Sequence, residues 1–382
     1  MKEAKGLPSS TLSGGKMKKV AILTNIVAPY RVCVYRQLGE EFEIAILISG
    51  SEGNRKNWDQ VQEKLGDIRL KRVWGFSLTI PQRGKRGVFD YRYLHINPGY
   101  LTELVRFAPD AVISNEMGFR SLMALLYAKV FRRPLWVWWG GTLHTERAIG
   151  PVKALWRRVF ARLVPRWISY GKTSTEYLIH LGVPRERILE IQNCVDEKLF
   201  AKPVPPAFTF SPKPVLLYVG QLIERKGVDL LLESAARVQN KGYAFTLVLV
   251  GDGPEKERLE RKALTLGLRN LHFLPSRKPE EMPAVYRSAD ALIFPTLEDV
   301  WGLVVNEALW SGIPVISSIY AGCTPEIVPP GNRFDPLNPE DFDAALERAI
   351  KGELAPPDTS VLLTCEEVGK MIVGDIQRLL SQ

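Results

Sequence analysis

Short apolar runs alternate with stretches of helical periodicity along almost the whole chain. The first half holds such runs at residues 19–24, 111–114, 135–139 and 167–170, and the second half at 215–219, 245–250, 271–274, 291–294 and 314–317. Runs of this length predict buried strands, and their alternation with helices is typical of parallel sheets. The pattern therefore predicts an α/β protein with two Rossmann-like, doubly wound sheets.

A proline-rich stretch separates the two series of strands. Residues 202–214 read KPVPPAFTFSPKP, and so much proline cannot support a regular helix or a central strand. We expect a flexible tail at residues 1–16, an N-terminal domain at 17–201, a linker at 202–214 and a C-terminal domain at 215–382, whose last helix can pack back on the N-terminal domain. Two such domains place the carboxyl ends of their strands across a cleft, where ligands bind.

Composition narrows the class of protein. Hydrophobic residues make up 46% of the 382 residues and charged residues 24%, which excludes a disordered or fibrous chain. Cys33, Cys194, Cys323 and Cys365 are scattered without metal-ligand spacing, so we expect reduced thiols in a cytoplasmic protein. Residues 1–16 lack the apolar run of a secretory signal, and charges interrupt the most apolar stretch, 121–139, so no transmembrane helix is expected.

The basic charge is concentrated in the first half of the chain. Residues 1–200 hold 32 basic and 18 acidic side chains, whereas residues 201–382 hold 19 and 24. One interpretation is an anionic partner such as a membrane surface, a lipid phosphate or an acidic glycan. The other is a solvated basic surface. No nucleic-acid-binding motif is visible, so nucleic acid is not expected as a partner.

Residues 150–166 predict an amphipathic helix within this basic half. Its apolar positions recur at helical spacing and its basic positions lie mostly away from them. One interpretation is an interfacial helix that docks on anionic lipid, and the other is a helix packed on the core with a solvated basic face. The apolar positions are Val152, Leu155, Trp156, Val159, Phe160 and Leu163, and the basic positions are Lys153, Arg157, Arg158, Arg162 and Arg166.

Two segments of the second half carry candidate chemistry. In VGQLIERKG, Gly220 ends a strand and Lys226 precedes a helix that begins near Gly227. Unpaired amides at a helix start attract anions and a neighbouring cation adds full charge, so a diphosphate is a natural ligand.

The second segment, LEDVWGLVVNEALWSGIPVI, places two carboxylates on either side of a Trp-Gly turn. Asp299 precedes a predicted helix and Glu307 lies inside it, and both can accept hydrogen bonds from hydroxyl groups. The alternative is that Asp299 only caps the helix and Glu307 faces solvent. The apolar neighbours of Glu307 argue against a solvent-facing position.

These segments resemble glycosyltransferase family 4, whose members are retaining enzymes with the two-domain GT-B fold. The resemblance covers nearly the whole chain and includes KKVAILTNIVAPYR, IQNCVDEKLF, LVLVGDGPE and SADALIFPT. It implies that Lys226 binds the donor diphosphate, Glu307 the ribose and Asp299 the donor sugar. Further donor-binding positions implied in this way are Gly220, Gln221, Arg225, Gly251, Trp301, Gly302 and Leu303.

The chain departs from the family at two of these positions. The family usually has Glu where this chain has Asp299, so hydrogen bonds to the sugar are expected to shift or to pass through water. The family usually has Arg where this chain has Gln221, which leaves Lys226 alone unless Arg225 turns inward. The alternative is an Arg225 that faces solvent.

Two loops of the first half carry candidate acceptor-side residues. Arg31 lies in APYR after the first predicted strand, where the family places its acceptor and phosphate loop. His144 lies in WWGGTLHTER, a region in which the family often has a His near the reacting centre, although a structural or exposed His is the alternative. Asp341 and Asp343 resemble the metal-binding triad of the other major glycosyltransferase fold, but their place at a predicted helix start favours capping.

The resemblance implies a function and a mechanism. A hexose-type sugar would move from a UDP- or GDP-sugar to a glycan or lipid-linked acceptor, with retention, in cell-surface polysaccharide or glycolipid synthesis. The departing diphosphate would take the acceptor's proton, without a metal or another cofactor, in the cytoplasm or on the inner face of the cell membrane. Two alternatives are left open: a metal-independent nucleotide-sugar epimerase of the same fold, and a catalytically silent sugar-nucleotide-binding protein.

Overall fold

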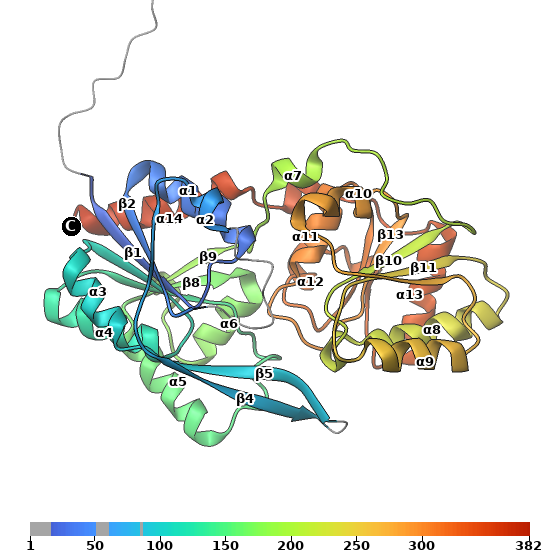
Figure 1. Cartoon of the computed structure of the whole chain (residues 1–382), viewed down its shortest axis with the longest axis horizontal. Helices are drawn as coiled ribbons and strands as arrows, with labels where there is room; N and C mark the ends of the chain where they lie inside the picture. The colour runs from blue at the N-terminus through green and yellow to red at the C-terminus, as the bar shows by residue number, and fades with distance from the viewer. Residues whose placement is uncertain (1–16, 51–60, 85–86) are drawn as a thin grey trace, which may run out of the picture.

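Two parallel sheets flanked by helices form the protein (Figure 1). The computed structural model describes residues 17–50, 61–84 and 87–382. The first sheet has the order β3-β2-β1-β6-β7-β8-β9 and the second the order β12-β11-β10-β13-β14-β15, and every pairing within them is parallel. This architecture confirms the predicted α/β fold class. The expected tail at residues 1–16 lies outside the described residues.

The strands of the first sheet belong to the N-terminal domain. They are β1 (Lys19–Thr24), β2 (Glu43–Ile48), β3 (Arg69–Arg72), β6 (Ala111–Asn115), β7 (Leu135–Trp139), β8 (Arg166–Tyr170) and β9 (Ile188–Ile191). A separate antiparallel hairpin, β4 (Phe76–Gly84) and β5 (Gly87–Ile96), projects away from this sheet (Figure 1).

Helices cover both faces of the first sheet. One face packs against α3 (Gly99–Phe107), α4 (Phe119–Phe131), α5 (Pro151–Leu163) and α6 (Gly171–His180). The other face packs against α1 (Val32–Glu41), with α2 (Val61–Leu65) beside it, and against the C-terminal helix α14 (Cys365–Leu380). A short helix, α7 (Glu197–Ala201), precedes residues 202–214, which hold no helix or strand.

The second sheet forms the C-terminal domain. Its strands are β10 (Val215–Val219), β11 (Thr246–Val250), β12 (Leu271–Leu274), β13 (Ala291–Phe294), β14 (Val315–Ser318) and β15 (Arg333–Phe334). Helices α8 (Val228–Asn240), α9 (Lys256–Thr265) and α13 (Pro339–Lys351) pack on one face. Helices α10 (Met282–Tyr286), α11 (Leu303–Trp310) and α12 (Thr324–Ile327) pack on the other.

The C-terminal helix returns to the N-terminal domain. In Figure 1, α14 lies beside α1 on the first sheet, far from the strands that precede it in the chain. Its buried Asp375 accepts a hydrogen bond from Trp136 Nε1 at 2.7 Å and forms an ion pair with Arg166 at 2.7 Å. A buried carboxylate held by two such partners fixes the helix in place, because leaving it unpaired would be costly.

The cysteines differ from the expectation of four reduced thiols. Cys33, at the start of α1, and Cys365, at the start of α14, form a disulfide across 332 residues of sequence. The prediction was wrong because only the return of α14 to the N-terminal domain brings these two helix ends together. Cys194 and Cys323 are buried free thiols.

Asp343, near the start of α13, also differs from its predicted role. Asn338 caps this helix, since its side chain accepts from the amides of Glu340 and Asp341. Asp343 instead turns into the domain, where it accepts hydrogen bonds from Ser234 and from Arg237 at 2.9 Å. The capping expectation was therefore wrong for Asp343, whose helix face packs against α8.

Candidate functional site

A glycine-dependent turn places Lys226 between the strand β10 and the helix α8. The short 3-10 helix Glu224–Lys226 ends at Gly227, whose φ is 65°. A Cβ at Gly227 would lie 2.2 Å from the carbonyl oxygen of Pro295, so only glycine fits there. The turn consequently packs against the loop that follows β13, and Leu297 N donates to Arg225 O at 2.8 Å.

Lys226 and Asp299 form an ion pair across these two loops. Lys226 Nζ contacts Asp299 Oδ2, and both side chains are mostly buried. Burial alone would raise the pKa of Asp299, but Lys226, Arg225 and a hydrogen bond from Trp301 N outweigh it, so the pKa lies below its usual value. The Asp299 carboxylate is therefore ionised at neutral pH. The sequence could not show that two of the predicted donor residues bind each other.

Arg225 and Gln221 take different positions beside this pair. Arg225 Nη1 donates to Glu298 O at 3.1 Å, so the guanidinium lies on the Asp299 loop rather than in open solvent. Gln221 is exposed, and its backbone carbonyl accepts a hydrogen bond from Tyr218 OH at 2.8 Å. Arg225 is thus the second cation near Asp299, as the inward alternative predicted.

Two glycines let neighbouring loops approach at the ends of β10 and β11. Gly251 has a φ of 155°, and a Cβ there would lie 1.9 Å from the carbonyl oxygen of Gly220. Gly220 itself has a φ of 156°. The two predicted donor glycines are therefore in contact, and the backbone they expose lies at the carboxyl end of the sheet.

The Trp-Gly turn sets the start of α11. Gly302 has a φ of 107°, and a Cβ there would lie 2.5 Å from the ring of Phe294. Trp301 is buried, and its Nε1 donates to Asn306 at 2.9 Å, so its indole is part of the core rather than a ligand surface. Leu303, the first residue of α11, packs partly against the same core.

Glu307 faces a cavity between the two domains. Tyr286 OH donates to its Oε2 at 2.6 Å, and burial raises the pKa of Glu307 to about 7. We call this space of about 500 Å³ the α1–α11 cavity. Its other lining residues include Tyr30, Cys33 and Arg36 near the start of α1, Phe200 of α7, and Pro279 and Glu280.

His144 reaches the C-terminal domain from the loop after β7. Its Nε2 lies 2.8 Å from Leu297 O, and its ring stacks on Tyr320 with centroids 4.6 Å apart. Close by, Arg147 forms an ion pair with Glu298 at 2.9 Å. The loop that holds His144 therefore contacts the loop that holds Asp299, so the two predicted site segments do meet.

Arg31 is buried rather than open to the space between the domains. Only 3% of it is exposed, and its guanidinium lies over the rings of Trp138 at 3.9 Å and Tyr170 at 4.7 Å. Its Nη2 has no hydrogen-bond partner among the described residues. The sequence placed Arg31 in the correct loop but could not show that aromatic rings cover it.

A second cavity, of about 430 Å³, lies at the carboxyl ends of β6, β7 and β8. We call it the β7–β8 cavity. Sequence reasoning missed two of its charged residues, Glu116 and Arg120, which pair at 2.7 Å. Glu116 has a φ of 64°, which a side-chain-bearing residue rarely adopts and which often marks a functional position. The signal available was its position two residues after the predicted strand at 111–114.

Much of the chain resembles known proteins. Residues 205–360 match the family model described as glycosyl transferases group 1. The C-terminal half of the chain is therefore similar to this family. This match contains the Lys226 turn, the Asp299 loop and Glu307.

Relatives and solved structures extend the comparison to the N-terminal domain. Sulfoquinovosyl transferase SQD2 of Arabidopsis thaliana is 28% identical over 281 residues, which cover 65% of this chain and 51% of that protein. The chain thus matches about half the length of this curated relative. The structure of Anabaena Alr3699/HepE with UDP and glucose has a TM-score of 0.66 at 18% identity, covering 95% of this chain and 98% of that one. Sucrose-phosphate synthase of Thermosynechococcus elongatus has a TM-score of 0.66 at 16% identity, covering 95% of each chain. These structures share the GT-B fold.

Proposed function

We propose that this protein is a retaining glycosyltransferase that moves a hexose-type sugar from a UDP- or GDP-sugar to a glycan or lipid-linked acceptor. The observation that carries the proposal is the arrangement of the Lys226–Asp299 pair, Glu307 and the interdomain α1–α11 cavity in a chain whose C-terminal half is similar to the group 1 family. The cavity volume suits a nucleoside. Cell-surface polysaccharide or glycolipid synthesis in the cytoplasm is the setting we propose.

The residues divide the work of sugar transfer between them. Glu307 accepts hydrogen bonds from the ribose, and Asp299 from the donor sugar. Lys226, with the amides at the start of α8, stabilises the charge that builds on the diphosphate as it leaves. The acceptor hydroxyl attacks on the face of the leaving group and its proton passes to the diphosphate. These groups supply the positive charge that a metal ion supplies elsewhere, so we propose that transfer needs no metal or other cofactor.

Acceptor-dependent release of nucleoside diphosphate tests this function. We expect release from a UDP- or GDP-sugar to rise when extracts of glycan or lipid-linked acceptors are added, and to persist in a metal chelator. Conversion of the nucleotide sugar to an epimer without release would support the epimerase instead. Binding without turnover of any nucleotide sugar would support a silent sugar-nucleotide-binding protein.

Thermal unfolding with a panel of nucleotides identifies the base. A ligand that binds only the folded protein at 100 times its dissociation constant adds about 2.7 kcal/mol to the free energy of unfolding. We expect either UDP or GDP, but not both, to raise the melting temperature. Glu307 binds the ribose of both nucleotides, so the difference comes from contacts with the base. A panel without any effect would contradict a nucleotide site.

The exposed faces of α4 and α5 support an anionic membrane surface as a further partner. On α5, Val152 is 82% and Leu155 is 65% exposed, so the predicted apolar face points mostly away from the core, with Phe160 buried. Among the basic positions, Arg157 is buried against Glu146 and Tyr177, and Arg166 is mostly covered in its ion pair with Asp375. The basic residues Arg158 and Arg162 remain exposed.

Helix α4 continues this surface on the same side of the sheet. Both helices contribute to one core cluster, and α4 exposes Leu122, Leu126 and Val130 at spacings of one turn. Lys129, Arg132 and Arg133 are exposed beside them. Apolar side chains flanked by cations suit the boundary of an anionic bilayer. No helix within the described ranges is long and apolar enough to span a membrane.

Vesicle sedimentation tests the membrane surface. We expect binding to anionic but not to neutral vesicles, weakened by salt and by Arg158→Glu with Arg162→Glu, since each basic residue near an anionic surface contributes about 1 kcal/mol. The matched control is Arg261→Glu with Arg277→Glu, which makes the same charge change on the C-terminal domain. Equal recovery of the wild type in the supernatant with both vesicle types would point to a soluble acceptor.

A further inference from the structure

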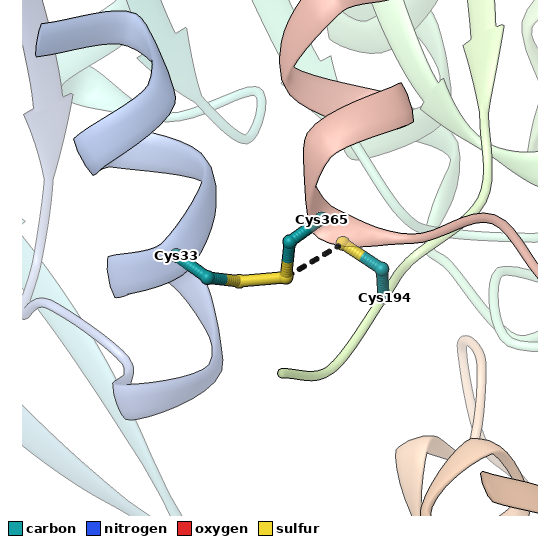
Figure 2. Close-up of side chains that lie close together, drawn as sticks. All are labelled: Cys33, Cys194 and Cys365. Atoms are coloured by element: carbon teal, nitrogen blue, oxygen red, sulfur yellow. Dashed lines mark hydrogen bonds between the residues drawn. A yellow bond between two sulfur atoms is a disulfide. The ribbon is translucent and has the colours of Figure 1, made fainter. Parts of the chain in front are cut away.

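Three of the four cysteines meet at one place in the fold. The sulfur atoms of Cys33, Cys194 and Cys365 all lie within 4.8 Å of one another. Figure 2 shows that they come from three separate segments: the first turn of α1, the irregular segment after β9 and the first turn of α14. The fourth cysteine, Cys323, lies in the core of the C-terminal domain and serves as an internal control.

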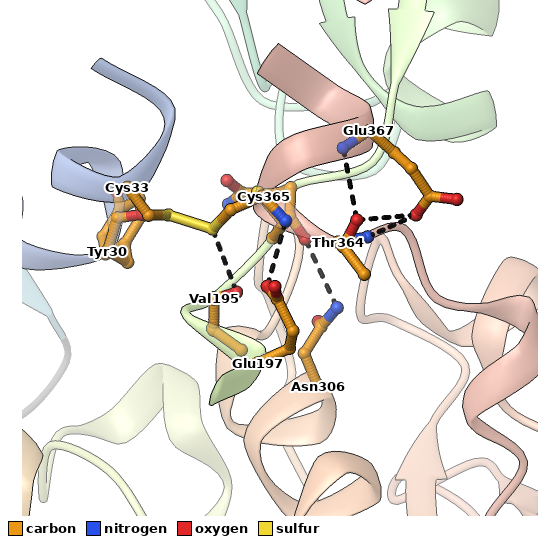
Figure 3. Close-up of a disulfide and its surroundings, with 10 residues drawn as sticks. Tyr30, Cys33, Val195, Glu197, Asn306, Thr364, Cys365 and Glu367 are labelled. Atoms are coloured by element: carbon orange, nitrogen blue, oxygen red, sulfur yellow. Dashed lines mark hydrogen bonds between the residues drawn. A yellow bond between two sulfur atoms is a disulfide. The ribbon is translucent and has the colours of Figure 1, made fainter. Parts of the chain in front are cut away.

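The cluster sits where the chain passes between the domains. Cys194 lies on the segment that leaves the N-terminal domain, and Cys365 lies where the chain returns to it. Hydrogen bonds join the two crossings: Gln192 Nε2 donates to Val361 O at 2.8 Å, and Cys365 N donates to Glu197 at 3.0 Å. Figure 3 shows these crossings around the disulfide. A covalent bond formed here therefore lies beside both chain crossings, on the N-terminal domain's side of them.

Cys365 is within reach of both other cysteines. It is bonded to Cys33, while Cys194 Sγ lies 3.8 Å from Cys365 Sγ and points toward it (Figure 2). This distance is close to van der Waals contact, and the segment that carries Cys194 is packed against the start of α14. No backbone rearrangement is needed to bring the third sulfur to the disulfide.

We propose that Cys33, Cys194 and Cys365 form a thiol–disulfide exchange centre in which Cys365 pairs with either Cys33 or Cys194. In the exchange, Cys194 sulfur attacks Cys365 sulfur, the bond between Cys365 and Cys33 breaks, and Cys33 leaves as a thiolate that takes up the proton lost by Cys194. One disulfide is lost and one is formed, so this step needs no oxidant. Forming the first disulfide from two thiols consumes one low-molecular-weight disulfide and releases two thiols.

The surroundings of Cys194 keep this exchange slow at neutral pH. Burial raises the pKa of its thiol to about 11, although the guanidinium of Arg31 acts in the opposite direction. The thiolate is the attacking species, so a thiol held protonated reacts slowly. Uncatalysed disulfide rearrangement takes minutes to hours, which is long enough to trap both pairings by acid quenching.

Whether Cys365 is bonded to Cys33 or to Cys194 also affects the α1–α11 cavity. Cys33 lines that cavity together with Tyr30, Arg36 and Glu307. A bond between Cys33 and Cys365 ties the first turn of α1 to α14. If Cys194 bonds to Cys365 instead, that turn is released and the free thiol of Cys33 faces the cavity. This second step rests on the proposed function, because it concerns the site assigned to the nucleotide.

Disulfide mapping tests the centre without requiring any activity. Under glutathione disulfide with a metal chelator present, we expect Cys194→Ser to retain the Cys33–Cys365 bond and Cys33→Ser to form a Cys194–Cys365 bond. Cys323→Ser should match the wild type. If Cys33→Ser keeps Cys194 and Cys365 both free under conditions that oxidise the wild type fully, the exchange centre is wrong.

The wild type supplies a test that does not depend on variants folding. Samples quenched during oxidation and alkylated should contain both pairings, and a complete absence of the Cys194–Cys365 bond at every time would overturn the proposal. For the cavity, we expect Cys33→Ser and the reduced wild type to raise the donor KM about fivefold over the oxidised wild type, the lower end of ordinary coupling between sites. An unchanged KM would overturn the link to the cavity, whereas a protein without transferase activity would still give the mapping result.

Discussion

Lys226→Met is expected to lower turnover about 100-fold or more, with a smaller rise in the donor KM. The loss of one preorganised group that stabilises developing charge typically costs a factor of 100 or more in kcat. Methionine retains the aliphatic stem, which matters because Lys226 Nζ lies 5.4 Å from the centre of the Phe294 ring. Steady-state kinetics with saturating acceptor measure both constants.

The ion pair calls for a control, since removal of Lys226 leaves Asp299 buried without its principal partner. A stranded carboxylate could itself disturb the site. The double variant Lys226→Met with Asp299→Asn removes that charge, and we expect turnover to remain low in it. Recovery of turnover in the double variant, or a loss below about fivefold in the single one, would show that leaving-group stabilisation comes from elsewhere. Arg225 would be the first residue to test, through Arg225→Met.

The Lys226–Asp299 ion pair also has a consequence for how a donor would bind. Asp299 balances the charge of Lys226 in the structure, so under the proposed function an arriving diphosphate would share the cation with that carboxylate. Hydrogen bonds from the hydroxyls of a donor sugar to Asp299 would then offset the weaker interaction of Asp299 with Lys226. The shorter Asp at this position places its carboxylate on Lys226 in the structure. We infer that donor sugar and diphosphate are recognised together rather than as independent parts.

Buried interior strands are easier to predict from the sequence than exposed edge strands. Buried strands such as β7, LWVWW, are continuous apolar runs, and all nine predicted strands are present. The missed β3, RLKR, is mostly polar because it lies at the edge of its sheet, where three of its four residues are exposed. The missed β2, EIAILI, carried a clear apolar run that could have been recognised.

The candidate site was predictable where its residues are adjacent in sequence. The turn at Lys226 and the helix holding Glu307 follow from local patterns of glycine and apolar residues. Contacts between distant segments were not predictable: Tyr286 on Glu307, the rings over Arg31, and Cys33 with Cys365. Each depends on how the two sheets and the C-terminal helix pack, which linear patterns do not encode.

Glu307→Ala is expected to weaken nucleotide-sugar binding by about 1.5 to 3 kcal/mol, the usual contribution of hydrogen bonds to a charged group. Glu307→Gln should weaken it less, because the amide oxygen still accepts. Tyr286→Phe is a matched control that removes the phenol bonded to Glu307 but leaves the carboxylate. Calorimetry on folded variants measures the affinities, and wild-type affinity in Glu307→Ala would refute the ribose role.

The pH dependence of binding gives the same residue a second, independent signature. Burial raises the pKa of Glu307 to about 7, so the group is mainly protonated at pH 6 and ionised at pH 8. Because the folded state holds this proton more tightly than the unfolded chain, the group's contribution to the free energy of unfolding decreases as pH rises from about 4.5 to 7.

The affinity for a nucleotide sugar should instead increase as pH rises, because ribose hydroxyls donate more strongly to the ionised carboxylate. We expect binding to be about tenfold weaker at pH 6 than at pH 8. The diphosphate of a nucleotide sugar does not titrate in this range, which makes it the appropriate ligand. The Glu307→Gln variant should bind with an affinity that is flat over the same interval, and an equal slope in both proteins would assign the titration to another group.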